Sequence, residues 1–163
     1  MKVLDFALEM EQMGKSYFER LAGETTVGGI RTVFNLLARE QQELYDTFLA
    51  MKRGASAHCN ADSQALERAR DRFAEIFAAN GTAVDLLKED LEAYEHAMKV
   101  EADIVRFFEE LAEQERNEES RALLREIAAE ERRHYDVVES IHDFVAAPKW
   151  HLNWGEFSNL KEI

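Results

Sequence analysis

Apolar residues recur every three or four positions along almost the whole chain, a period that is typical of amphipathic α-helices. A single proline in 163 residues leaves few forced breaks. The predicted helices cover about residues 4–24, 30–53, 64–79, 82–114 and 118–147. Thr82 and Asp85 have the spacing of a capping box that would open the fourth helix, and Pro148 is expected to end the last one. The pattern therefore predicts an all-α protein.

The chain resembles itself at an offset of 90 residues. Residues 7–48 align with residues 97–138 without a gap, and 11 of the 42 positions are identical. Such self-similarity indicates a repeated structural unit, here a helical hairpin. We expect one domain, 1–163, divided into a first hairpin at 1–53, a crossover at 54–81, a second hairpin at 82–147 and a C-terminal tail at 148–163. The crossover, which contains a short helix, is long enough to travel the length of a four-helix bundle and start again in the same direction.

Charge and composition exclude several classes of function. A net charge of -13 and a pI near 4.8 argue against nucleic acid and anionic membranes as partners, because both require basic patches. No stretch approaches the roughly 20 apolar residues of a membrane span, and no signal-peptide features are present, so we expect a cytoplasmic protein. The single Cys59 excludes an internal disulfide and a four-cysteine iron or zinc module in this chain.

Several polar residues fall on the predicted apolar faces. At 100° per residue, Glu101 lies near the middle of the apolar arc of helix 82–114. Glu131 and His134 lie together among the inner residues of helix 118–147, and Glu11 lies at the flank of the first apolar stripe. A buried carboxylate costs several kcal/mol unless it is protonated, hydrogen-bonded or bound to a cation. Three converging glutamates and one histidine fit a cation best.

The two copies differ at the level of these acids. Each residue of the first copy precedes its counterpart by 90 positions: Glu11 precedes Glu101, Gln41 precedes Glu131 and Leu44 precedes His134. The second copy therefore carries a Glu-x-x-His pair that the first lacks. Gln41 follows Glu11 by 30 residues, and Glu131 follows Glu101 by the same 30 residues. This equal spacing places these four positions at one level of the bundle. Another Glu-x-x-His pair, Glu139 and His142, has no such counterpart and is expected to be a chance match.

Four phrases carry a resemblance to the rubrerythrin-like ferritin superfamily, and it extends over both hairpins. They are FALEMEQMGKSYFERLA and HAMKVEADIVRFFEELA in the first helices of the hairpins, and LLAREQQELYDTF and IAAEERRHYDVV in the second helices. Proteins of the family that this chain resembles have the pattern Glu-x6-Tyr/Phe in the first helix of each hairpin and the pattern Ala-x2-Glu-x2-His in the second. Together these motifs supply four carboxylates and two imidazoles to a di-iron centre. The resemblance implies a ferritin-like bundle with non-haem iron.

The chain matches this pattern in part. The matching positions are Glu11 with Phe18, Glu101 with Phe108, and Ala128 with Glu131 and His134. In the first hairpin, Ala38 is followed by Gln41 and Leu44, so one carboxylate and one imidazole of the family pattern are missing. The chain also lacks the cysteine-rich electron-transfer module of true rubrerythrins.

We predict a metal site built from four ligands, with iron as the expected metal, in one or two ions, and manganese or zinc also compatible. The predicted ligands are Glu11, Glu101, Glu131 and His134. Gln41 and Tyr135 are candidates for hydrogen bonds to these ligands. The charge of three carboxylates, -3, is balanced by one trivalent ion, or by one divalent ion together with a nearby proton or hydrogen-bond donor. Glu40 and Glu43 could substitute from helix 30–53, although Glu40 lies roughly 90° off the inner arc, which favours a solvated role.

Each predicted ligand also has a purely structural interpretation. Glu101 could be a buried acid that is hydrogen-bonded to a tyrosine or glutamine, and His134 could be a core histidine capped by Glu131. Glu11 could be the hydrogen-bond partner of Gln41. Three aromatic residues of the tail are expected to cap the bundle end or form a dimer contact: Trp150, Trp154 and Phe157.

Two functions of different class stay open. In the first, which the resemblance implies, the protein is a non-haem iron oxidoreductase that reduces peroxide or dioxygen. In the second, it is a non-catalytic bundle that has lost the dinuclear centre and acts in metal binding, in sensing or through protein partners. The replacements at Gln41 and Leu44 favour the second function, and the intact motifs of the other hairpin favour the first. A homodimer is expected, and the sequence does not identify a redox partner.

Overall fold

The computed structural model describes residues 2–54, 64–81 and 87–158, and these ranges contain five α-helices. The helices are α1 Val3–Glu24, α2 Gly28–Gly54, α3 Gln64–Gly81, α4 Asp90–Gln114 and α5 Glu118–Ser158. The prediction of an all-α protein is confirmed. None of the described helices combines the length and the apolar character that crossing a membrane requires.

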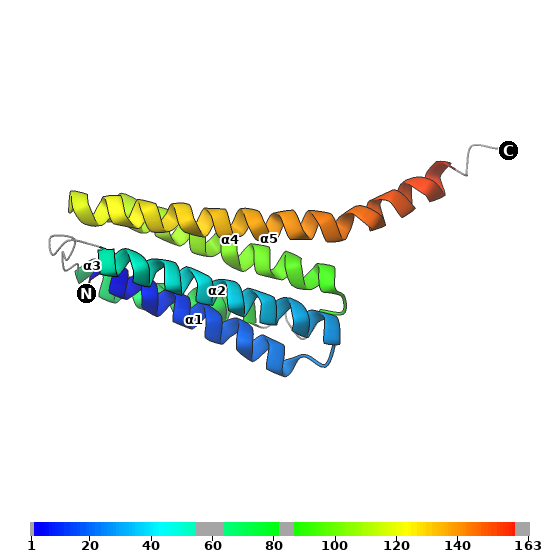
Figure 1. Cartoon of the computed structure of the whole chain (residues 1–163), viewed down its shortest axis with the longest axis horizontal. Coiled ribbons are helices and arrows are strands. Elements are labelled where there is room, and N and C mark those ends of the chain that lie inside the picture. The colour runs from blue at the N-terminus through cyan, green and yellow to red at the C-terminus, as the bar shows by residue number, and fades with distance from the viewer. Residues whose placement is uncertain (1, 55–63, 82–86, 159–163) are drawn as a thin grey trace.

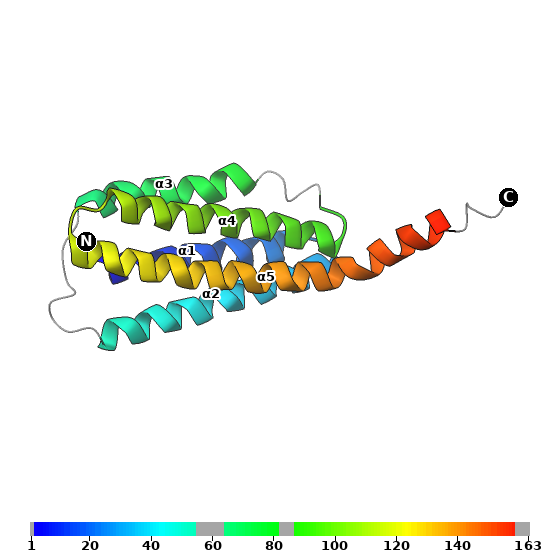
Figure 2. The ribbon, with the colours of Figure 1, turned by 90° about the horizontal axis from the view of Figure 1, so that it is seen from above.

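Four long helices form a bundle, and the shorter α3 packs along its side. α1 and α2 run antiparallel, as do α4 and α5, and α3 packs against α1 and α4 (Figure 1). Because α3 returns along the bundle, α4 runs in the same direction as α2 (Figure 2). The crossover predicted at 54–81 therefore contains a helix that runs along part of the bundle.

The apolar faces of all five helices meet in one core. Its largest fully buried side chains are phenylalanines: Phe6, Phe18, Phe34, Phe48, Phe73 and Phe108. Each contributes roughly 1.5–3 kcal/mol by leaving water. Phe73 of α3 lies edge-on to Phe107 of α4, with ring centroids 5.1 Å apart, so the crossover helix is held by the same aromatic core.

The start of α4 differs from the prediction. Leu87 and Lys88 are not helical, and the helix begins at Asp90 rather than at Thr82. The carboxylate of Glu92 accepts hydrogen bonds from the backbone N–H groups of Lys88 and Glu89, which satisfies donors that the helix itself cannot pair. The predicted capping box at 82–85 lies outside the described residues. The prediction was wrong because a second, equally local capping signal follows the first.

The end of α5 also differs, because the helix continues through Pro148 to Ser158. A proline removes one helical hydrogen bond and bends a helix, but it does not have to end it. The ribbon bends where α5 leaves the bundle and projects beyond the other helices (Figure 1). The side chains of Trp150, Trp154 and Phe157 lie outside the described part of the structure, so their role as a cap or dimer contact stays a prediction.

Candidate metal centre

The four predicted ligands lie on three helices and are all buried. Glu11 on α1 is 2% exposed, Glu101 on α4 is 0% exposed, and Glu131 and His134 on α5 are 0% and 6% exposed. Each occupies a core-facing position in an otherwise apolar helix face, so the helical period carries it inward. The unusual feature is four ionisable side chains inside a core of phenylalanines and leucines.

Three of these side chains converge on one point. Ligand atoms of Glu101, Glu131 and His134 all lie within 4.8 Å of one another. Nδ1 of His134 lies 3.3 Å from Oε2 of Glu101, but the contact is not aligned as a hydrogen bond. Donors that bind one transition-metal ion each lie at about 2.0–2.2 Å from it. Small side-chain movements would therefore bring all three donors to one ion.

The same atoms lack hydrogen-bond partners among the described residues. Both carboxylate oxygens of Glu131, Oε2 of Glu101 and both ring nitrogens of His134 make no hydrogen bond there. A buried polar atom left unpaired costs about 1–3 kcal/mol, and more when it is charged. Carboxylate oxygens and imidazole nitrogens, which two glutamates and one histidine provide here, are ligands that bind a borderline divalent metal such as iron or zinc. The residues present therefore fit a metal ion.

Glu11 is adjacent to this group but not part of its tightest set. Burial, together with the neighbouring charge of Glu131, raises the pKa of Glu11 well above its usual value. Two ionised carboxylates cannot hydrogen-bond, but a protonated Glu11 can donate to Glu131. Glu11 thus lies next to Glu131, whereas the sequence suggested Gln41 as its partner and Gln41 instead donates to Glu101.

Gln41 contacts the cluster as a hydrogen-bond donor. Its Nε2 donates to Oε1 of Glu101 at 3.1 Å, and both groups are buried. Its amide oxygen lies over Gly14 of α1, where an added Cβ would be only 2.5 Å away. Gln41 therefore holds the carboxylate of Glu101 in place and turns its own acceptor away from the cluster. Leu44, one turn further along α2, is buried and offers no ligand atom.

The charges of the cluster are strongly coupled. Burial raises the pKa of Glu131 to about 7, and the charge of Glu101 adds to this effect. Burial alone would lower the pKa of His134, but the carboxylates of Glu101 and Glu131 outweigh it and raise the pKa to about 9. Near neutral pH the cluster holds protons that a bound cation would displace.

Other residues considered from the sequence lie outside the cluster. Glu40 is half-buried and Glu43 is exposed. The hydroxyl of Tyr135 donates to Oε1 of Glu139 at 3.3 Å. The ring of His142 lies next to Asp143, with Nδ1 3.1 Å from its Oδ1. Glu139 and His142, the second Glu-x-x-His pair, therefore contact other residues of α5 outside the cluster.

One buried polar pair escaped the sequence analysis. The hydroxyl of Tyr17 and Nε2 of His96 are hydrogen-bonded at 2.8 Å, and burial raises the pKa of Tyr17 to about 12. Phe77 of α3 covers this pair, with its ring centroid 4.7 Å from that of Tyr17. His96 shares a buried stripe of α4 with Ala93, Val100 and Phe107, and the ring of Phe34 on α2 lies 6.3 Å from its own ring.

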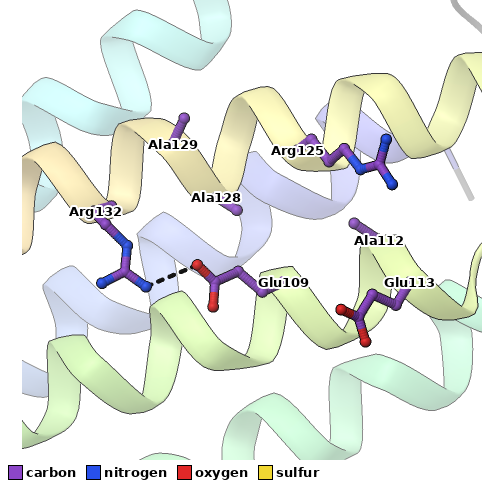
Figure 3. Close-up of a pocket in the computed structure, with 7 residues that line it drawn as sticks. All are labelled: Glu109, Ala112, Glu113, Arg125, Ala128, Ala129 and Arg132. Atoms are coloured by element: carbon purple, nitrogen blue, oxygen red, sulfur yellow. Dashed lines mark hydrogen bonds and ion pairs between the residues drawn. The ribbon is translucent and has the colours of Figure 1, made fainter.

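A surface furrow between α4 and α5 is not the metal centre. It is lined by Glu109, Ala112, Glu113, Arg125, Ala128, Ala129 and Arg132 (Figure 3). Arg132 donates to Glu109 across it at 2.7 Å. None of the predicted ligands lines this furrow, and its buried lining residues are Ala112 and Ala128.

Comparison with known proteins identifies one family. The sequence model of the family described as Rubrerythrin matches residues 2–141. The match covers α1 to α4 and most of α5, and it contains all four predicted ligands. No curated protein and no solved structure matches the chain.

Proposed function

The chain belongs to the rubrerythrin family, and from this premise we propose that it is a ferritin-like metal-binding protein with one non-haem iron ion. The proposed ligands are Glu101, Glu131 and His134, and Glu11 completes the set from α1. Two repeated hairpins, α1–α2 and α4–α5, form the bundle in this proposal. The equivalence of Glu11 and Glu101, both buried at the same level, supports that repeat.

The observation that carries the proposal is the set of unpaired buried atoms. Glu101, Glu131 and His134 approach within 4.8 Å and have five atoms without a hydrogen-bond partner among the described residues. A purely structural core residue would be paired, because protein interiors pair the great majority of their buried polar groups. One cation can bind the carboxylate oxygens and one ring nitrogen of His134, because the two nitrogens of an imidazole point away from each other.

A single ion is favoured because α2 contributes no ligand. Gln41 directs its N–H group at Glu101, and a donor cannot bind a cation. Leu44 occupies the position at which the family pattern has an imidazole. Three carboxylates and one imidazole balance one divalent ion if Glu11 keeps its proton, and one trivalent ion if it does not.

Iron at this position would supply electron transfer to peroxide or dioxygen, which gives a non-haem oxidoreductase. The surrounding residues would assist in defined ways. Glu11 would hold a proton next to Glu131, Gln41 would keep the carboxylate of Glu101 oriented, and the phenylalanine core would limit the access of water.

A non-catalytic role in metal binding or sensing is the second candidate. The same two residues of α2 favour it, since Gln41 and Leu44 remove half of the ligands that one hairpin supplies in the family pattern. In this case the ion would stabilise the bundle without turning over a substrate.

Metal analysis of protein purified without oxygen tests the proposal. The parent should hold about one ion per chain, and the Glu131→Ala and His134→Ala variants should hold none. Glu139→Ala and His142→Ala are matched controls, because they remove a Glu-x-x-His pair of the same spacing outside the cluster. At a free metal concentration 100 times the Kd, binding should stabilise the parent by about 3 kcal/mol. A parent without stoichiometric metal, and with a Tm that metal does not change, would contradict the proposal.

Mixing the iron-loaded protein with peroxide separates the two candidates. An oxidoreductase should give a fast change in iron absorbance that His134→Ala lacks. Equal rates in the parent and this variant would exclude the redox role.

A further inference from the structure

We propose that a surface cavity between α2 and α5 is the route by which a divalent cation reaches the buried cluster. Glu40 and Glu43 form its acidic mouth, and His134 forms its inner end. This inference rests on the proposed metal-binding function and adds the path and the residues that attract the ion.

The cavity has a volume of about 200 Å³. Its lining comes from two helices: Glu40, Glu43, Leu44 and Thr47 from α2, and Glu130, Arg133, His134 and Val137 from α5. The other three proposed ligands do not line it. His134 is thus the residue that this cavity shares with the buried cluster.

The ring of His134 connects the two spaces. The side chain is 6% exposed, so it is more than nine-tenths buried. Its Nδ1 lies 3.3 Å from Glu101 in the cluster, and its Nε2, at the other side of the ring, has no hydrogen-bond partner among the described residues. Once His134 has released its proton, its imidazole at the end of this surface cavity offers an arriving cation the first buried ligand.

The charge of the cavity favours cations. Arg133 pairs with Glu130, so these two charges cancel. Among the described residues, no side chain forms an ion pair or hydrogen bond with the carboxylates of Glu40 and Glu43. The carboxylate of Glu40 is close enough to His134 to interact with its ring charge. A recess with one sign of charge and low-dielectric walls raises the local concentration of the opposite ion.

The walls explain why the ion would not stop before it reaches His134. Leu44 and Val137 line the cavity and carry no ligand atoms. Leu44 stands where the other hairpin has its histidine, so the residue that removes a ligand from α2 also leaves the route free of a competing site. The furrow between α4 and α5 differs, because Arg132 spans it to Glu109 (Figure 3).

The kinetics of Co²⁺ binding to the metal-free full-length protein test this route. The visible absorbance of the bound ion gives association and dissociation rate constants by stopped flow. Glu40→Gln/Glu43→Gln should lower the association rate constant by about 3- to 10-fold at low ionic strength, and the difference should shrink in 0.5 M salt, a concentration at which the Debye length is only about 4 Å. The control Glu109→Gln/Glu113→Gln changes the net charge equally on α4, away from this cavity, and should match the parent.

A steric variant checks the path independently of charge. Val137→Trp places a large ring at the wall of the cavity and should slow association and dissociation alike while the equilibrium constant is kept. If Glu40→Gln/Glu43→Gln binds Co²⁺ as fast as the control, or if Val137→Trp binds and releases it as fast as the parent, the route is wrong even though the metal site stands. If the parent binds no Co²⁺, the proposed function fails and the route fails with it.

Discussion

Replacing Glu131 by glutamine should stabilise the metal-free protein at high pH. The side chain is fully buried, and its pKa is about 7 in the folded protein and 4.5 in the unfolded chain. As the pH rises above 4.5 the unfolded chain releases this proton first, which favours unfolding until the folded protein also releases it near pH 7. The integrated loss of stability is roughly 3 kcal/mol above pH 7. An amide of the same shape never ionises and avoids this loss.

Urea unfolding in the presence of a chelator, followed by far-ultraviolet circular dichroism, measures the effect. At pH 5, where most of Glu131 is protonated in the folded protein, Glu131→Gln and the parent should differ by less than about 1 kcal/mol. At pH 8 the variant should be more stable by about 3 kcal/mol. The exposed Glu126 on the same helix provides the control, because Glu126→Gln should change stability equally little at both pH values. Saturating metal should reverse the order of parent and Glu131→Gln.

The reasoning is refuted if parent and Glu131→Gln lose the same stability between pH 5 and pH 8. That result would mean that the carboxyl of Glu131 is already solvated or paired when no metal is bound. The unpaired buried acid that supports metal binding would then not exist.

Three further predictions concern the ligand set, the packing behind it and the assembly. Combining Gln41→Glu with Leu44→His restores the family pattern and should raise bound iron from one toward two per chain, whereas an unchanged ratio would contradict the single-ion interpretation of α2. Gly14→Ala should lower the free energy of unfolding in urea by about 1–3 kcal/mol, because the added Cβ would lie 2.5 Å from the amide oxygen of Gln41. The amide would then move and weaken its hydrogen bond to Glu101. An unchanged free energy of unfolding would show that the amide is free to move. Phe144 on α5 is 81% exposed, so if the expected homodimer uses this surface, Phe144→Glu should sediment as a monomer, and an unchanged mass would exclude the contact.

The helical period predicted the elements well but not all of their ends. The predicted end of the first helix at residue 24 agrees with the structure, in which α1 ends at Glu24. The start of α4 was misplaced because two capping signals compete within eight residues, and a tertiary contact distinguishes them. Asp90 at the start of α4 lies against Gly29 at the start of α2, where a larger side chain would collide with it. A contact between segments 61 residues apart is not visible in local sequence.

The positions of the predicted ligands could be inferred from their spacing along the chain and from the face of the helix on which each lies. The 30-residue spacing and the inward face of each helix were enough to bring Glu101, Glu131 and His134 together. The hydrogen bond from Gln41 to Glu101 agrees with the structural interpretation of Glu101 as an acid bonded to a glutamine. The contact of the amide oxygen with Gly14 was not predictable from one helix alone. Periodicity does not show which neighbouring helix covers each side of a helix, so the hydrogen bond between His96 and Tyr17 of α1 could not be anticipated.

An anomalous X-ray difference map of crystals grown with iron tests the central claim most directly. The account predicts one peak per chain, bonded at about 2.0–2.2 Å to Glu101, Glu131 and His134, with no second peak next to Leu44. A map without a peak at this position, in which these acids are paired only with protein groups or water, would contradict it.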